Sequence, residues 1–421
     1  MNTKHWITAA IVAGIMTACG QKKTTSSDLV YLNYQKTEIQ EESSPKNKQV
    51  FTIDLSEVEY TEEPQPLSDF VESIEYIKLS EEPLIHDAAL VDMAIDRDDN
   101  FYISGPNYLF KYTGSGTFIK SLIRIGQGPN EVAMYIGAIF NMERDFILID
   151  SYGRDYPKIS LDGEQIGIVK RPSYPQRQVY AYWKDYEMYK IQHPEHNGKI
   201  NHDGEFFFNI MDIRTDSTIY RMRNHNSNIE GKLGSRAYNE SYPIYRGPLN
   251  DSVYWIKPLF IDTIYCTTNW TDVQPLYIIK QHNDAADYEW LIKVDAGIEN
   301  VSKSELFNKD RLEHVWALES GILYSYIEEI RPDGEKIGYG YCPANGKGKY
   351  YSKLFKNDID DYCPSLNFRF IMQNCSMVCK NGYIYIPVNA HKFFEEGAKP
   401  PFPDLTEDSN PVIVRLKLKK N

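Results

Sequence analysis

The chain has 421 residues, of which 42% are hydrophobic, and a formal net charge of −13 at pH 7. Such an apolar content excludes a disordered protein, because the chain holds enough apolar side chains to form a core. The negative charge argues against a nucleic-acid partner, since binding to phosphates depends on Lys and Arg.

The first nineteen residues have the pattern of a secretory signal. Lys4 precedes an apolar run, Ile7 to Met16, and the small residues Thr17-Ala18 stand directly before Cys19. This order resembles the lipobox of bacterial lipoproteins, which implies cleavage before Cys19, lipid on its thiol and the bacterial membrane as a partner. A membrane-spanning anchor is an alternative, but the run is shorter than the ~20 apolar residues that a bilayer requires. An ordinary cleaved signal, the other alternative, has no need of Cys at that point.

A polar segment separates this signal from the rest of the chain. Residues 20–49 contain clusters of Lys, Thr, Ser and Glu and show no sustained apolar period. Such a composition predicts a flexible tether. The predicted organisation is therefore a lipoprotein signal peptide over 1–18, a lipidated tether over 19–49 and a globular domain over 50–421.

From Val50 onward the chain alternates between apolar and polar residues in short runs that favour β-strands. Clear examples are Asn100–Ser104, Tyr108–Thr113 and Thr117–Arg124, and the last two are separated by the hairpin sequence Gly114-Ser115-Gly116. Aromatic and β-branched residues dominate these runs, as strands prefer. We expect consecutive antiparallel strands that form a small sheet.

The same pattern then recurs. Asp145–Asp150 repeats Asn100–Ser104 at a distance of 45 residues, and Asp162-Gly163 repeats the turn. A period of ~40–60 residues with four strands per unit is typical of a β-propeller. We predict an all-β fold, a six-bladed β-propeller with four antiparallel strands per blade. A β-sandwich or several domains are the alternatives.

A propeller ring must also close. The alternating segment Val50–Leu55 is expected to pair with Val412–Leu418 in the last blade. A short surface helix is expected over Ser302–His314, where Ser302 and Glu305 have the spacing of a capping box.

One segment carries a family resemblance. "IRIGQGPNE", Ile123 to Glu131, follows a predicted blade, and Pro66–Glu82 resembles the start of the same family. Together they resemble the six-bladed propeller lipoproteins with a G-x-G-P-x-E loop, which are related in appearance to NHL repeats. The resemblance implies the propeller fold and export. It implies no reaction, because most members of this family have no assigned function.

The G-x-G-P-x-E loop has two interpretations. As a structural turn, it relies on the backbone freedom of Gly126 and Gly128 and on the fixed φ of Pro129. As a ligand-facing rim, it would use the polar side chains Arg124, Gln127, Asn130 and Glu131.

Signals for metal or catalytic chemistry are weak. His193, His196 and His202 lie close together, but Pro194 and Gly198 indicate a hairpin tip rather than the helix of a zinc protease. The acidic stretch Asp96–Asn100 lacks the Gly and the distal Glu of an EF-hand loop, and a tight turn is the preferred interpretation. No nucleophile elbow, P-loop or dinucleotide fingerprint occurs, and we expect no cofactor. Five cysteines besides Cys19 are interpreted as small buried apolar residues.

These observations predict a membrane-anchored, exported, non-catalytic propeller that binds a protein or carbohydrate ligand through its central mouth or rim loops. A propeller lyase or hydrolase and a structural scaffold of the cell envelope are the alternatives. The segment after Cys19 lacks the acidic residues that often mark surface-exported lipoproteins, so the expected location is the periplasmic face of the outer membrane.

Overall fold

The structure is a computed structural model. It describes residues 50–85, 92–128, 131–132, 134–141, 143, 145–151, 155–170, 177–191, 195–196, 199–200, 206–223, 244–246, 253–257, 262–270, 272–281, 311–318, 320–331, 334–363, 365–366 and 378–419. In this part of the chain the only helices are two 3-10 turns, η1 (Leu67–Asp69) and η4 (Ala390–Phe394). No helix among these residues is long and apolar enough to cross a membrane. The predicted all-β class is confirmed.

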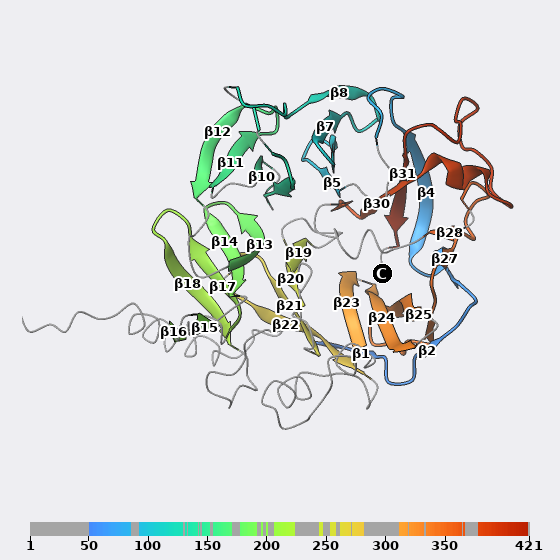
Figure 1. Ribbon diagram of the computed structural model, residues 1–421. Coiled ribbons are helices and arrows are strands. Elements are labelled where there is room, and N and C mark those ends of the chain that lie inside the picture. Colours follow the sequence, from blue (N-terminus) through green and yellow to red (C-terminus); the bar gives the residue numbers. More distant parts are fainter. Residues whose placement is uncertain are drawn as a thin grey trace, which may run out of the picture.

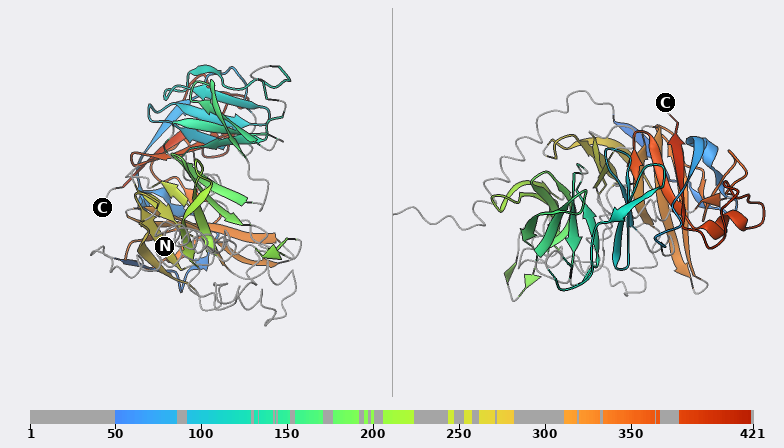
Figure 2. Two further views of the ribbon diagram at one scale, coloured as in Figure 1. Left: turned by 90° about the vertical axis from the view of Figure 1, so that its left-hand side faces the viewer. Right: turned by 90° about the horizontal axis from the view of Figure 1, so that it is seen from above.

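The sheets follow one another around a ring (Figure 1). Seven sheets of the described residues contain three or more strands, and we count each as a blade. The predicted β-propeller is therefore confirmed, and the predicted number of six blades is wrong. Seen from above, the blades stand side by side, as expected of a propeller rather than a sandwich (Figure 2).

The first three blades in chain order have four strands each, as predicted. The first consists of β5 (Asp92–Ile95), β6 (Phe101–Gly105), β7 (Tyr108–Tyr112) and β8 (Phe118–Ser121). The second consists of β9 (Gly137–Phe140), β10 (Phe146–Asp150), β11 (Asp155–Ser160) and β12 (Gln165–Lys170). The third consists of β13 (Arg177–Trp183), β14 (Tyr186–Ile191), β17 (Phe206–Asp212) and β18 (Ser217–Arg223), and a separate hairpin joins β15 (Glu195–His196) to β16 (Lys199–Ile200).

The remaining four blades are less regular. The fourth blade is built from β19 (Ile244–Arg246), β20 (Tyr254–Ile256), β21 (Thr263–Thr267) and β22 (Gln274–Lys280). The fifth is built from β23 (Arg311–Leu318), β24 (Gly321–Arg331) and β25 (Gly334–Pro343). The short strand β26 (Tyr350–Tyr351) follows β25 in the chain. The two last are built around β27 (Phe355–Lys356) with β28 (Ser365–Leu366), and around β29 (Cys379–Lys380), β30 (Tyr383–Val388) and β31 (Val412–Leu418).

The blade that sequence reasoning missed is the one around β27 and β28. Its strands are two residues long, and alternation cannot be recognised over two residues. Its third strand, β3 (Gln65–Pro66), comes from a distant part of the chain. No local pattern therefore marks this unit as a blade.

Residues 51–78, here called the strap, add one strand to each of four consecutive sheets. β1 (Phe51–Asp54) pairs with β22, β2 (Glu59–Tyr60) with β26 and β3 with β27, all in parallel. β4 (Val71–Lys78) pairs with β31 in antiparallel fashion. The strap thus connects sheets that are formed by residues 274–418, and it draws the two ends of the described chain together.

The ring is closed by β4 and not by β1. The expected pairing of Val50–Leu55 with Val412–Leu418 is wrong, because Val412–Leu418 pairs with Val71–Lys78 and β1 lies on β22. Val50–Leu55 alternates regularly in polarity, whereas Val71–Lys78 does so only in part. Cross-strand charges favour the observed pair, since Lys417 contacts Glu72 (2.9 Å) and Arg415 contacts Glu75 (3.2 Å).

The predicted 45-residue repeat is confirmed, and a shared contact between neighbouring blades explains its turns. Gly116 and Gly163 occupy equivalent turns before β8 and β12, both with positive φ. A β-carbon on Gly116 would collide with the carbonyl of Lys78, and one on Gly163 would press on the carbonyl of Leu122. Each turn therefore packs closely on the outer edge of the preceding blade, which explains why Gly recurs there.

The expected helix over Ser302–His314 is wrong in the part that the structure describes. Residues 311–318 form β23, which pairs with β24, and residues 302–310 lie outside the described residues. Leu312, Val315 and Trp316 are buried in the core. Burial in a sheet thus overrides the local helical pattern.

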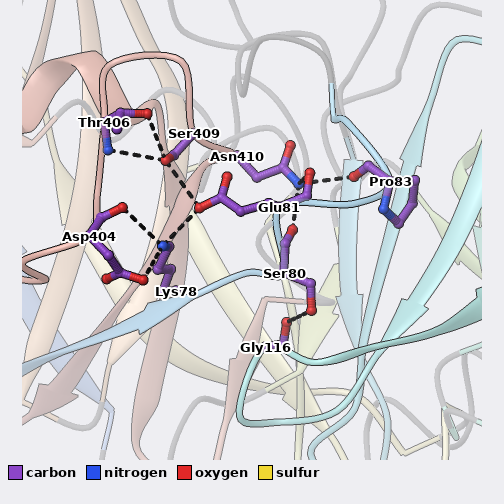
Figure 3. A network of polar contacts seen from close by, with 9 residues as sticks. All are labelled: Lys78, Ser80, Glu81, Pro83, Gly116, Asp404, Thr406, Ser409 and Asn410. Carbon is purple, nitrogen blue, oxygen red and sulfur yellow. Dashed lines mark hydrogen bonds and ion pairs between the residues drawn. The ribbon is translucent and has the colours of Figure 1, made fainter.

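The chain after β4 is held by the loop that leads into β31 (Figure 3). The amide of buried Asn410 donates to the carbonyls of Ser80, Glu81 and Pro83 (2.6, 3.2 and 2.9 Å) and accepts from the N–H of Ile85 (2.8 Å). One side chain thus satisfies four backbone groups.

The described cysteines, Cys266, Cys342, Cys363 and Cys379, are buried, which confirms their interpretation as buried core residues. Cys375 lies outside the described residues.

Burial predicts a pH-dependent stability. It raises the pKa of the Cys363 thiol to about 11 and that of Cys342 to about 12. The unfolded thiols lose their protons at lower pH, so stability should fall as pH rises from ~9 towards ~12. We expect iodoacetamide at pH 8 to label both residues in urea but not in the folded protein, as measured by peptide mass spectrometry. Equal labelling rates in both states would contradict the burial.

Candidate functional site

The G-x-G-P-x-E loop connects β8 to β9 and is closed by its own hydrogen bonds. The N–H of Val132 donates to the carbonyl of Arg124 (2.8 Å), and the N–H of Gly126 donates to the carbonyl of Val132 (3.1 Å). The Glu131 carboxylate accepts from the N–H of Gly128 (2.7 Å). A β-carbon on Gly126 would collide with this carboxylate. Glu131 is thus engaged inside the turn.

The other predicted rim residues are only partly described. Arg124 and Gln127 are exposed on the loop surface. Pro129 and Asn130 lie outside the described residues. The loop geometry supplies a structural use for Glu131, Gly126 and Gly128, and a ligand-binding use of Arg124 and Gln127 stays a prediction.

The histidine cluster is also partly described. His196 belongs to β15 and pairs with Lys199 of β16, so this stretch is a hairpin as expected. His193, His202 and the predicted lipidation site Cys19 lie outside the described residues. Across the described ranges, no group of three or more His, Cys, Asp or Glu side chains is arranged to hold a metal ion.

The acidic stretch Asp96–Asn100 forms the tight turn between β5 and β6, as predicted. Buried Asp96 accepts from the N–H groups of Asp98 and Asn100 (2.8 and 2.9 Å) and from the hydroxyl of Tyr102 (2.8 Å). Burial and this carboxylate raise the pKa of Tyr102, so the phenol keeps its proton and donates it.

Lys380 fixes this turn to another blade. Its buried ammonium, at the β29–β30 turn, donates to the carbonyls of Asp96 (2.9 Å) and Arg97 (2.6 Å) and to the carboxylate of Asp99 (2.7 Å). Arg97 is therefore held on a backbone that two blades support.

The Arg97 side chain leads to a polar cluster that joins four blades. Its guanidinium contacts the Glu143 carboxylate at 2.8 Å. The same carboxylate accepts from the indole N–H of Trp183 and from the hydroxyl of Tyr254 (2.9 Å). These four residues come from four different blades, at the β5–β6 turn, the β9–β10 turn, the end of β13 and the start of β20.

Aromatic rings form a rigid base beneath this carboxylate. The ring of Trp183 stacks on that of buried Trp270 at 5.6 Å between centroids, and Tyr254 lies against both rings at 6.0 and 5.9 Å. The ammonium of exposed Lys184 lies 4.5 Å from the centroid of the Trp183 ring. We call Arg97, Glu143, Trp183, Lys184 and Tyr254 the hairpin rim.

The hairpin rim presents two cations on a preorganised support. The Arg97 side chain is 63% exposed and uses one nitrogen on Glu143, which leaves N–H groups that face solvent. Lys184 is also exposed, and its ammonium lies over the ring of Trp183, whose indole N–H donates to Glu143. Such an arrangement is suited to bind a carboxylate, sulfate or phosphate group of a ligand, because charged hydrogen bonds from fixed donors are strong.

Sequence reasoning missed the hairpin rim, although a signal existed. When the 45-residue repeat is extended to the turns, the stretch from Asp96 to Phe101 aligns with Asn141 to Phe146, so Arg97 and Glu143 fall in equivalent turns. The third and fourth blades repeat too weakly for Trp183 and Tyr254 to be found in this way.

Comparisons with known proteins support the fold alone. No protein-family model matches the chain, and no curated protein matches it. A Bacteroides fragilis protein described as a candidate exported protein is similar in structure, with a TM-score of 0.54 and 14% identity over 88% of this chain and 100% of its own. A DUF4221 member from Bacteroides vulgatus has a TM-score of 0.44 and 12% identity over 83% and 98% of the two chains. A virginiamycin B lyase from Staphylococcus aureus has a TM-score of 0.33 and 10% identity over 82% and 99%.

Proposed function

We propose that this chain is an exported, lipid-anchored propeller that binds an acidic ligand, of the class of acidic carbohydrates, at the hairpin rim. The observation that carries the proposal is the convergence of four blades on the Glu143 carboxylate, which holds the exposed guanidinium of Arg97 in place. Exposed ion pairs are common on protein surfaces, but the carboxylate of this pair also accepts from Trp183 and Tyr254 of two further blades. The N–H groups of Arg97 that Glu143 does not use are therefore held where a ligand can reach them.

Export and anchoring are supported by the sequence before residue 50. The order of Lys4, the apolar run and Cys19 is that of a lipoprotein signal, and a structurally similar protein is described as exported. Lipid on Cys19 would supply the membrane attachment that an acidic protein lacks, since anionic lipids repel it. The proposed location is the periplasmic face of the outer membrane.

Binding at the hairpin rim is tested by calorimetric titration of the full chain with polygalacturonate, with neutral dextran as the matched uncharged polymer. We expect polygalacturonate alone to bind, and more weakly as salt increases, because salt screens exposed charges. Arg97→Ala is expected to weaken binding by about 10-fold or more, as loss of a charged hydrogen bond costs ~1.5–3 kcal/mol. Lys184→Ala should weaken it by a smaller factor.

Lys399→Ala is the control, because Lys399 is an exposed lysine paired with Asp361 at 2.8 Å, away from the hairpin rim in the chain. It should leave binding unchanged. Equal affinities of Arg97→Ala and the unaltered chain, or equal binding of dextran, would overturn the proposed site. If a protein ligand is captured and its binding depends on Arg97, the proposed site is supported, but its ligand is a polypeptide and not a carbohydrate.

A further inference from the structure

The outer strands of the blades differ in whether another strand covers them. The strap covers β22, β26, β27 and β31, whereas among the described residues nothing pairs with the outer side of β8, β12 or β18. An uncovered edge presents unpaired N–H and C=O groups, and it is a template for an added strand. Of these three edges, β12 most resembles one that the strap covers.

β12 and β22 share the same local geometry. Each carries one extra residue relative to its inner neighbour, Ile166 in β12 and Leu276 in β22. β8 and β18 have the same bulge, at Ile119 and Ile219, so the residues after the bulge distinguish the edges. After this bulge, β22 reads Tyr-Ile-Ile-Lys over residues 277–280, and β12 reads Gly-Ile-Val-Lys over residues 167–170. The strap strand β1 pairs with residues 277–280 only, beyond the bulge. The bulge therefore does not prevent strand addition at this position.

The contacts of β1 show what such an edge recognises. Phe51 lies against Tyr277 at 5.5 Å between ring centroids, and buried Ile53 lies opposite Ile279. The carboxylate of Asp54 lies 3.6 Å from the ammonium of Lys280. The N–H of Leu55 donates to the carbonyl of Lys280 at 2.7 Å. An aromatic residue, an apolar residue and a carboxylate thus occupy positions one, three and four of the added strand.

The edge of β12 has the complementary features but no strand on it. Ile166 and Ile168 are 53% and 59% exposed, and Ile278, at the position of β22 that corresponds to Ile168, is 45% exposed with β1 paired to it. A β-carbon on Gly167 would meet nothing closer than 3.9 Å. The edge of β12 therefore has open space at the position that corresponds to Tyr277 of β22. Lys170 is exposed at the position of Lys280.

The other two edges lack this chemistry. The equivalent positions of β8 begin with Lys120 and Ser121, and those of β18 contain buried Arg221. Neither offers an exposed isoleucine followed, two residues later, by an exposed lysine.

We propose that the β12 edge, residues 167–170, is a docking site for an extended segment of a partner protein, which adds in parallel as β1 adds to β22. The segment has an aromatic residue at position one, an apolar residue at position three and Asp or Glu at position four. Backbone hydrogen bonds supply affinity, and the carboxylate facing Lys170 sets the register. This surface is distinct from the hairpin rim, so it stands or falls independently of ligand binding there.

The probe is a fluorescein-labelled peptide of residues 50–56, Val-Phe-Thr-Ile-Asp-Leu-Ser, titrated with the full chain and followed by fluorescence anisotropy. We expect binding with a Kd on the order of 100 μM. Ile168→Lys should weaken binding by about 10-fold, since it places a charge without a matching carboxylate in the middle of the edge. Lys170→Glu should weaken it too, and a peptide with Asp54→Lys should restore binding to that variant. Ile219→Lys, which alters an exposed isoleucine on β18, is the matched control and should have no effect.

Several outcomes would overturn the proposal. One is no binding up to about 1 mM peptide. A second is binding that Ile278→Lys abolishes and Ile168→Lys does not, which means that the peptide replaces β1 on β22. A third is self-association of the chain that Ile168→Lys abolishes, which assigns the edge to a second copy. A fourth is binding seen only after residues 1–49 are removed, which means that the chain covers its own edge.

Discussion

Deletion of residues 50–56 is expected to lower the thermal unfolding midpoint by about 10 °C, since a loss of ~3–6 kcal/mol shifts a large domain by a few degrees per kcal/mol. The deletion removes β1 and its pairing with β22. It also removes Ile53 and Leu55, which are fully buried, and each such side chain contributes ~1.5–3 kcal/mol. Differential scanning calorimetry measures the change.

Two point variants in β1 show how much of this loss comes from its buried side chains. Ile53→Ala should destabilise the chain by about 3 kcal/mol, because it leaves a cavity in the core. Thr52→Ala, on the exposed face of the same strand, should change stability by less than ~0.5 kcal/mol. An unchanged midpoint after the deletion would show that the strap does not stabilise the ring.

Asn410→Ala is expected to destabilise the chain by about 3 kcal/mol, because it removes the partner of four partly buried backbone groups, and a buried group left unpaired costs ~1–3 kcal/mol. One is the N–H of Ile85. The others are the carbonyls of Ser80, Glu81 and Pro83 (Figure 3). These groups follow β4, the strand that closes the ring. Urea unfolding followed by tryptophan fluorescence measures the loss.

Ser409→Ala is the matched control for this joint. The Ser409 hydroxyl contacts Glu81 and Thr406 in an exposed position (3.2 and 3.1 Å), where water replaces lost contacts. We expect a change below ~0.5 kcal/mol. Equal effects of the two variants would refute the role of Asn410 in closing the ring.

Local pattern was enough to predict the regular blades. The alternation around Asn100–Ser104 and Asp145–Asp150, with Gly in the turns, corresponds to β6, β10 and the hairpins beside them. β6 and β10 are buried on both faces, because a blade packs against a neighbour on each side. The outer strands β8 and β12 keep the period-two pattern, because only one of their faces is turned inward. The tight turn at Asp96–Asn100 was also predictable, since Asp and Asn side chains satisfy nearby backbone groups.

Closure was not predictable from local pattern, because Val50–Leu55 alternates more regularly than Val71–Lys78, the strand that pairs with β31. Which one pairs with β31 depends on residues about 340 positions away, such as Lys417 opposite the acidic side chains of β4. The blade around β27 was hidden for a related reason, since two-residue strands carry no period and their third strand lies in the strap.

The candidate site likewise combines features that are local in the sequence with contacts between distant residues. By itself the sequence determined the fold class, the repeating strands and turns and the absence of strong catalytic motifs, because these depend on residues near each other in the chain. Only the tertiary structure decided that seven blades form, that β4 closes the ring and that Arg97, Glu143, Trp183 and Tyr254 meet. Those contacts join residues from separate blades, and the free energy that selects them comes from burial and charge pairing between distant segments.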